Sequence, residues 1–132
     1  MPLQVELVSP ETIGFSGEAS MVLARTTAGE IAFLPGHVPF VGVLSGKGPV
    51  KVKLTDGKTI TVAVHSGFVE VSNDRVAILS DVSEMAGSID VARARRSKEA
   101  AEARLREHDD DKAAAAALVR ANLRIAVAAD SH

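Results

Sequence analysis

The sequence predicts a β + α protein, in which an N-terminal antiparallel β-sandwich is followed by a C-terminal hairpin of two antiparallel helices. Two observations support this fold class. From Leu3 to about Asp81, apolar and polar residues alternate with period two, which is typical of strands with one buried face. Past Met85 the chain becomes rich in Ala, Arg and Glu, which favour helix. We therefore expect two domains, a sandwich over residues 1–86 and a helical hairpin over residues 87–132.

The clearest strand signal is a hairpin around Asp56-Gly57, a pair that favours a type I′ turn. In both strands that flank this turn, apolar residues alternate with polar ones, so one face of the hairpin is expected to be apolar and the other exposed to water. The apolar positions are Val50, Val52, Leu54, Ile60, Val62 and Val64. Further short strands are expected at 4–9, 20–27, 68–72 and 75–80, with a tight turn at Asn73-Asp74. This pattern predicts a sandwich or a flattened barrel.

Residues 29–42, which read GEIAFLPGHVPFVG, break this alternation and are interpreted as a long, non-periodic loop. Pro35 and Pro39 each fix their own φ and push the preceding residue towards extended geometry, while Gly36 gives freedom to turn between them. The loop is therefore expected to be stiff and specifically shaped. Such a loop favours a docking function.

Start and stop signals divide the C-terminal part into two helices. Ser88 or Asp90 is the expected cap of the first, which runs to about Glu107. The three aspartates at 109–111 can end it and cap a second helix over about 112–128.

The apolar stripe of this second helix is thin. It consists of Leu118, Ala121 and Ile125, with Leu123 and Val127 beside it. Because Ala methyl groups bury little apolar area, such a face stabilises helix packing less than a Leu-rich face does. We hypothesise that the hairpin is held only weakly in any one arrangement and can detach and rebind elsewhere.

Composition excludes several classes of protein. The chain has 132 residues, of which 46% are hydrophobic, enough to bury a sizeable core. The absence of Cys excludes disulfides and thiolate chemistry. A net charge of −2, with no Trp or Tyr, disfavours nucleic-acid binding. With no run of about 18 apolar residues and no apolar leader, the chain is expected to stay in the cytoplasm.

The sequence offers little for catalysis. The four histidines lie in separate segments without metal-ligand spacing, and no nucleophile elbow, P-loop or dinucleotide fingerprint is present. His37 is expected to hold its turn by a backbone hydrogen bond. We therefore expect no catalytic residue, no metal site and no obligatory cofactor.

One charged group of residues suggests an anion site. If the second helix folds back so that Arg120 and Arg124 lie beside Arg93, three guanidinium groups converge, which suits a polyphosphate. The alternative is a solvated helical surface in which Glu99 and Glu102 offset nearby arginines. Spacing alone favours the solvated surface.

Several motifs together resemble the epsilon subunit of bacterial F-type ATP synthases, called delta in mitochondria. The resemblance runs over essentially the whole chain, and the LPGHxP loop in a sandwich followed by a helical hairpin is its most specific part. The motifs are VELVSP at 5–10, FSG at 15–17, GEI at 29–31, LPGHVP at 34–39, SGFVEV at 66–71 and IDVARA at 89–94.

The resemblance implies a non-catalytic rotor subunit in the central stalk of a proton-translocating ATP synthase. Such a subunit is a peripheral protein on the cytoplasmic face of the bacterial cell membrane and a monomer when isolated. Its sandwich binds the gamma subunit and the membrane c-ring. Its C-terminal helices are mobile and inhibit ATP hydrolysis by reaching the catalytic alpha/beta hexamer. The residues implied in the ring contact are Glu30, Leu34, Pro35, Gly36 and His37.

The resemblance also implies ATP as a regulatory ligand that holds the hairpin down on the sandwich. The residues implied in that site are Glu84, Ile89, Asp90, Arg93, Ala94, Arg120 and Arg124. Relatives that bind ATP tightly also carry a basic residue in the middle of the first helix, and Lys98 is the candidate here.

A hypothesis from another class is a free-standing β-sandwich that binds a small molecule and whose tail is a dimerisation hairpin. It predicts self-association through the tail and no gamma partner, whereas the first hypothesis predicts a monomer that gamma captures. An enzyme comes third, because the motifs assemble no nucleophile, base and orienting group.

Overall fold

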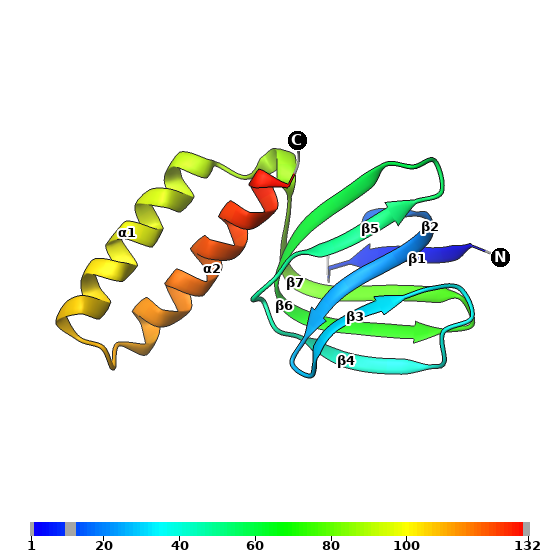
Figure 1. Cartoon of the computed structure of the whole chain (residues 1–132), viewed down its shortest axis with the longest axis horizontal. Helices are drawn as coiled ribbons and strands as arrows, with labels where there is room; N and C mark the ends of the chain where they lie inside the picture. The colour runs from blue at the N-terminus through cyan, green and yellow to red at the C-terminus, as the bar shows by residue number, and fades with distance from the viewer. Residues whose placement is uncertain (1, 10–12, 131–132) are drawn as a thin grey trace.

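The computed structural model describes residues 2–9 and 13–130, so Pro10 of the first motif and His132 lie outside it. The sandwich and the helical hairpin stand end to end, which makes the molecule elongated (Figure 1). The strands are β1 (Leu3–Val8), β2 (Ile13–Thr26), β3 (Gly29–Phe33), β4 (Phe40–Leu44), β5 (Val50–Leu54), β6 (Thr59–Ser72) and β7 (Arg75–Met85). A short 3-10 turn, η1 (Ala86–Ser88), leads into α1 (Val91–Glu107) and α2 (Lys112–Ala129).

The two longest strands tie the sandwich together. β2 and β6 each contain 14 residues, and each pairs with different partners along its length. β1 pairs antiparallel with β2 and parallel with β7, while β5 bridges β2 and β6. Because β6 also pairs with β7, these five strands close on themselves, with β3 and β4 added beside them. The predicted sandwich is confirmed, and this closure gives it the character of a flattened barrel.

The core lies between the strand layers and consists almost entirely of Val, Leu and Ile side chains, with Phe33 as its largest fully buried member. The alternation expected in β1 is present, since Leu3, Val5 and Leu7 are buried. In β6 the expectation of one wet face is wrong. Residues 61–64 are buried on both faces, because α2 covers the face that would otherwise meet water.

The long loop predicted over residues 29–42 is also wrong in extent. β3 and β4 occupy most of it, which leaves residues 34–39 as the connection. Ile31 and Phe33 face inward with period two and Phe33 pairs with Val22, so the strand pattern is present but short. Pro35 and Pro39 lie outside the strands, as residues without an N–H donor must in a paired sheet.

Of the two predicted tight turns, the one at Asn73-Asp74 is present, while the one at Asp56-Gly57 differs in type. Gly57 has a φ of 93° and its N–H donates to the Leu54 carbonyl over 3.0 Å, but Asp56 is not among the described non-glycine residues with positive φ. The connection is thus a three-residue loop with Gly in the left-handed position, and the type I′ prediction is wrong there. The pair with two positive φ values, 50° and 59°, is Asn73-Asp74.

The helix boundaries follow the predicted caps. The Asp90 side chain accepts from the Arg93 backbone N–H at 3.1 Å, and Asp111 accepts from Ala114 at 2.9 Å. α1 packs on α2 through small residues such as Ala94 and Ala101, which are buried, and α2 packs on β6. None of the helices in the described ranges is long and apolar enough to cross a membrane.

Gly67 in β6 gives a direct test of the close packing between β6 and β7. A Cβ at this position would collide with the backbone oxygen of Leu79. We expect Gly67→Ala to lower the free energy of unfolding by about 1–3 kcal/mol, the usual cost of overpacking. Gly87→Ala is the matched control, because a Cβ there meets nothing within 4 Å. If the two variants had equal urea midpoints, the close approach of β6 and β7 at Gly67 would be contradicted.

Candidate functional site

The hairpin meets the sandwich at a cluster of charged side chains from three elements. The Glu84 carboxylate on β7 accepts a hydrogen bond from Arg124 Nε on α2 at 2.7 Å. The same oxygen lies 2.8 Å from Nε2 of His65 on β6, whose side chain is only 6% exposed. Among the described residues, His65 Nδ1 is buried without a partner. This cluster links α2 to two neighbouring strands.

The ionisation of Glu84 makes the cluster sensitive to acid. Burial by itself raises the pKa of this carboxyl, but hydrogen bonds from Arg124 and then from His65 outweigh it and hold the pKa below the ordinary value. A carboxylate with a lowered pKa stabilises the structure fully above its ordinary pKa and loses that effect as pH falls through the lowered value. The contact is therefore at full strength at neutral pH.

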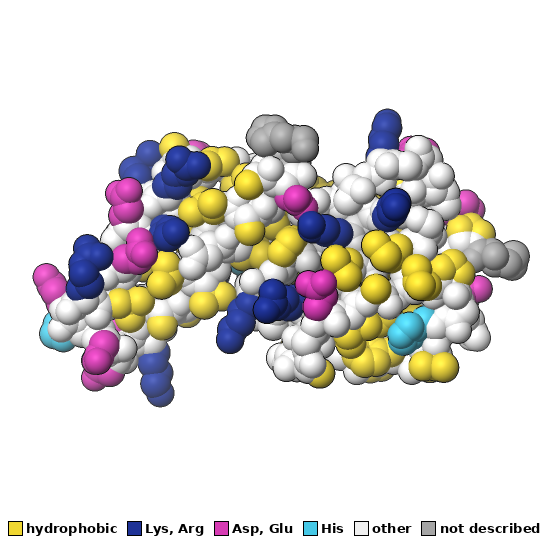
Figure 2. Space-filling view, in the orientation of Figure 1, with side chains coloured by type: hydrophobic (Ala, Val, Ile, Leu, Met, Phe, Trp, Pro, Cys, Tyr) yellow, Lys and Arg dark blue, Asp and Glu magenta, His cyan; other side chains and the backbone are white. Residues whose placement is uncertain are grey.

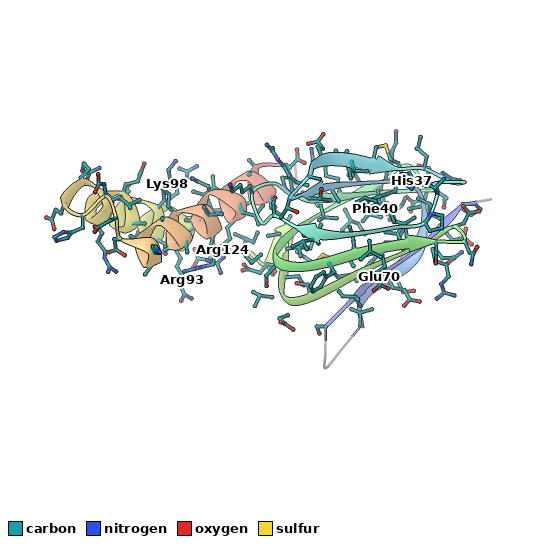
Figure 3. The ribbon with its side chains drawn as sticks, turned by 90° about the horizontal axis from the view of Figure 1, so that it is seen from below. His37, Phe40, Glu70, Arg93, Lys98 and Arg124 are labelled. Carbon is teal, nitrogen blue, oxygen red and sulfur yellow. The ribbon has the colours of Figure 1, made fainter. Side chains whose placement is uncertain are left out.

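A pocket of about 240 Å³ opens beside this cluster, between β7, η1 and the two helices. Figure 3 shows Arg93 and Arg124 next to each other at its rim. The structure brings together five of the seven predicted site residues and adds Ser97 and Ser88, the latter expected only as a helix cap. The predicted residues that line the pocket are Glu84, Asp90, Arg93, Ala94 and Arg124.

The remaining two predicted residues lie elsewhere. Ile89 packs against the small apolar cluster formed by Ala63, Leu123 and Val127. Arg120 lines a separate depression with His65 and residues of α2, so the three guanidinium groups do not meet at one point. Lys98 does not line the pocket either.

Three of the six residues of the IDVARA motif have a structural role. Asp90 caps α1, Ala94 is buried where the helices touch, and Ile89 anchors the start of the hairpin. The Arg93 guanidinium is exposed and makes no hydrogen bond or ion pair with any described residue. Together with Arg124, it gives the pocket guanidinium donors for an anionic group, although two carboxylates face the same space and the Ser88 hydroxyl already donates to the Met85 carbonyl at 2.9 Å.

A second polar contact between the hairpin and the sandwich lies at the end of α2, and the sequence did not predict it. Asp130 accepts from Lys51 Nζ at 2.8 Å and from the Thr61 hydroxyl at 3.4 Å. The hydrogen bond from Lys51 is the main reason why the pKa of Asp130 lies below its ordinary value. Neither this pair nor the His65–Glu84 pair has a local sequence signal, since the partners are far apart in the chain.

The predicted ring-contact residues follow the edge strand β3. Glu30 lies at its start and Leu34 to His37 lie just past its end, so they are spread along one edge of the sheet. Leu34 is 53% exposed. Figure 3 shows His37 at the end of the sandwich remote from the hairpin.

Several contacts give the loop at 34–39 its shape. The Gly36 N–H donates to the Asp74 carboxylate at 2.7 Å, and Gly36 has a φ of 84°. His37 Nδ1 lies 2.7 Å from the Val38 carbonyl, and its ring stands edge-on to Phe33 at 5.0 Å. The expected structural role of His37 is thereby confirmed. These contacts restrain the backbone of the loop, and its exposed tip is apolar.

Figure 2 shows basic and acidic side chains interspersed on the hairpin, with hydrophobic side chains exposed on both the hairpin and the sandwich. In the described ranges no group of three or more His, Asp or Glu residues has the arrangement of a metal site.

Comparison with known proteins agrees with this architecture. Residues 2–86 match the family described as ATP synthase, Delta/Epsilon chain, beta-sandwich domain. The ATP synthase epsilon chain of Streptomyces griseus subsp. griseus is 43% identical over 123 residues, 93% of this chain and 92% of that protein. The ATP synthase epsilon chain of Shouchella clausii is also 43% identical, over 96% of this chain and 94% of the relative.

Among solved structures, a chain of the Euglena gracilis mitochondrial ATP synthase, determined with OSCP, F1 and c-ring, has the same fold. The TM-score is 0.80 at 21% identity, and the match covers 99% of this chain and 82% of that one. The family match over the sandwich and the relatives that extend through the hairpin lead to one conclusion: the chain belongs to the delta/epsilon chain family of ATP synthase subunits.

Proposed function

We propose that the chain is a non-catalytic rotor subunit of a proton-translocating F-type ATP synthase, peripheral to the cytoplasmic face of the bacterial membrane. Residues 1–86 bind the gamma subunit and the membrane c-ring. Residues 87–132 form a regulatory hairpin that inhibits ATP hydrolysis when it leaves the sandwich and reaches the catalytic alpha/beta hexamer. Family membership and the exposed apolar surface of the sandwich support the assignment of partners.

The regulatory part of the proposal rests on one observation: only a small set of side chains attaches the hairpin to the sandwich. Ala63, Leu123 and Val127 form the buried apolar contact, and burying a Leu or Val side chain stabilises by only about 1.5–3 kcal/mol. Polar contacts add the Glu84–Arg124 pair and the bonds that Asp130 accepts from Lys51 and Thr61. A hairpin held by so few groups is suited to an equilibrium between a docked and a released state.

Arg124→Ala tests this attachment. Removing the guanidinium leaves a half-buried carboxylate without its closest cation, at an expected cost of about 1–2 kcal/mol. We expect amide exchange in α1 and α2 of the isolated chain to become about tenfold faster while the sandwich is unchanged. In the assembled enzyme ATP hydrolysis should fall, because the released hairpin is free to inhibit.

Arg96→Ala is the matched control, because it removes an exposed guanidinium of α1 that lines neither the pocket beside Glu84 nor the depression beside His65. If both variants exchanged like the native chain, the Glu84 cluster would not hold the hairpin, and the regulatory proposal would lose its structural support.

For the c-ring contact we propose the apolar loop tip together with Glu30 at the other end of β3. A part that transmits rotation must resist deformation. The bond from Gly36 to Asp74 and the two prolines restrict the backbone of this loop.

Asp74→Gly tests the bracing of the loop without straining the left-handed backbone at that position. In inverted membrane vesicles carrying the variant complex, we expect less ATP-driven proton pumping per ATP hydrolysed. Asp56→Gly is the control, because its carboxylate likewise caps a turn, through the Lys58 N–H at 2.9 Å, but far from this loop. Unchanged coupling in Asp74→Gly would argue against a rigid ring contact here.

For ATP we propose the pocket between Glu84, Arg93 and Arg124. Its volume of about 240 Å³ lies below the roughly 300–1,000 Å³ typical of small-molecule sites, so it is sized for phosphate groups with the nucleoside outside. Phosphate oxygens bound to guanidinium groups of both helices would tie the hairpin together and favour the docked state.

Titration of ATP into the isolated chain by calorimetry tests this site. We expect saturable binding that becomes at least tenfold weaker in Arg93→Ala, since this guanidinium is free to pair with phosphate. Arg95→Ala, on the same helix but outside the pocket, should bind like the native chain. Absence of heat at millimolar ATP would mean that the IDVARA residues are structural and that the hairpin is regulated by protein contacts alone.

A further inference from the structure

Ser97 is the only residue with a hydroxyl group in the two helices of the hairpin. Its neighbours in α1 are Ala, Arg, Lys and Glu, which favour helix more than Ser does, so helix stability does not account for it. The residue is exposed, and in the described ranges its hydroxyl takes part in no hydrogen bond. It nevertheless lines the pocket between the helices and β7. A hydroxyl in this position is accessible to a modification that adds an anion to the pocket.

Two guanidinium groups of the pocket are placed to pair with a phosphate on this residue. Arg93 precedes Ser97 by four positions on α1, so the two side chains are neighbours on one face of the helix. The Arg93 guanidinium has no partner among the described residues. Arg124 of α2 lines the same pocket, and Figure 3 shows it next to Arg93. A phosphate on Ser97 would therefore meet donors from both helices, in the paired geometry that guanidinium groups form with phosphate.

The acidic groups of the pocket are already engaged. The Asp90 carboxylate caps α1 at the Arg93 N–H, and the Glu84 carboxylate is held by Arg124 and His65. Their negative charge opposes an added anion, so the unengaged guanidinium of Arg93 is the stronger partner of the two. A phosphate group is small enough for the volume of about 240 Å³. Because it would be attached to the wall of the pocket, its local concentration there would far exceed that of a free ligand.

The residues before Ser97 suit recognition by a protein kinase with an acidic substrate groove. Arg93, Arg95 and Arg96 are exposed and precede the hydroxyl by at most four positions, so charge complementarity would attract such an enzyme. In the transfer, the Ser97 oxygen forms a bond to the γ-phosphorus of a nucleoside triphosphate. The bond from that phosphorus to the β,γ-bridging oxygen breaks and the nucleoside diphosphate leaves. The hydroxyl proton passes to a base of the kinase.

We propose that Ser97 is a phosphorylation site, and that its phosphate occupies the pocket in place of the phosphate groups of ATP. The inference rests on the proposed function, which assigns ATP to this pocket. The phosphorylated chain no longer responds to ATP, because Arg93 and Arg124 are already paired. Since a phosphate bound to both helices favours the docked state, phosphorylation holds the hairpin docked whatever the ATP concentration.

The test uses the full chain with phosphoserine installed at position 97 during its synthesis. By phosphorus NMR, we expect this phosphate to titrate at a lower pH than in the same chain with Arg93→Ala, because the guanidinium favours the dianion. ATP should bind at least tenfold more weakly than to the native chain, and amide exchange in α1 and α2 without ATP should become about tenfold slower. Phosphoserine in place of Ala100, exposed on α1 outside the pocket, is the matched control and should leave ATP affinity and exchange native.

Peptide mass spectrometry of the enzyme from growing and from starved cells tests whether the site is used, and we expect phosphate on Ser97 in one of the two. An unmodified Ser97 in both would overturn the inference. So would a phosphorus titration that Arg93→Ala leaves unchanged, native ATP affinity of the phosphorylated chain, or faster exchange in its helices. If the unmodified native chain binds no ATP, the proposed nucleotide site fails, and the phosphorus titration still decides whether the phosphate pairs in the pocket.

Discussion

The packing of α2 on β6 at Ala63 is the interaction on which the rest of the arrangement depends. Ala63 is fully buried beneath Leu123 and Val127, and its small side chain lets the helix approach the strand closely. The neighbouring Val62 and Val64 are buried in the sandwich core. This short stretch of β6 therefore joins two apolar clusters through one backbone. Once α2 lies here, Arg124 reaches Glu84 and the end of α2 reaches Lys51.

The two parts of the molecule differ in how much apolar surface they bury. The sandwich core contains Phe33, Leu3 and Ile78 and is enclosed by strands that close on themselves. The contact between the helices depends on alanines such as Ala94, Ala101 and Ala121, which favour helix but contribute little packing energy. Local opening is easiest where buried apolar contacts are few. The hairpin is consequently the part that can change position while the sandwich stays folded.

Polar side chains between the hairpin and the sandwich form hydrogen bonds with one another because they are partly removed from water. The carboxylate of Glu84 is held by Arg124 and His65, whereas Arg93, which lines the same pocket, has no described partner. The pocket thus holds one engaged and one unengaged guanidinium, one on each helix. An anion bound there would meet both helices and would act on the docked state.

The sequence by itself determined the division into sandwich and hairpin, the helix caps at Asp90 and Asp111 and the tight turn at Asn73-Asp74, because each depends on residues a few positions apart. It also pointed to five of the seven residues that line the candidate pocket, three of them in the IDVARA motif. Only the tertiary structure decided that both faces of β6 are buried at 61–64, that β3 and β4 shorten the predicted loop, and that Arg120 lies apart from Arg93. It alone revealed the partners His65–Glu84 and Lys51–Asp130. These features join residues from distant segments, and their positions follow from strand register and helix docking, for which local periodicity carries no signal.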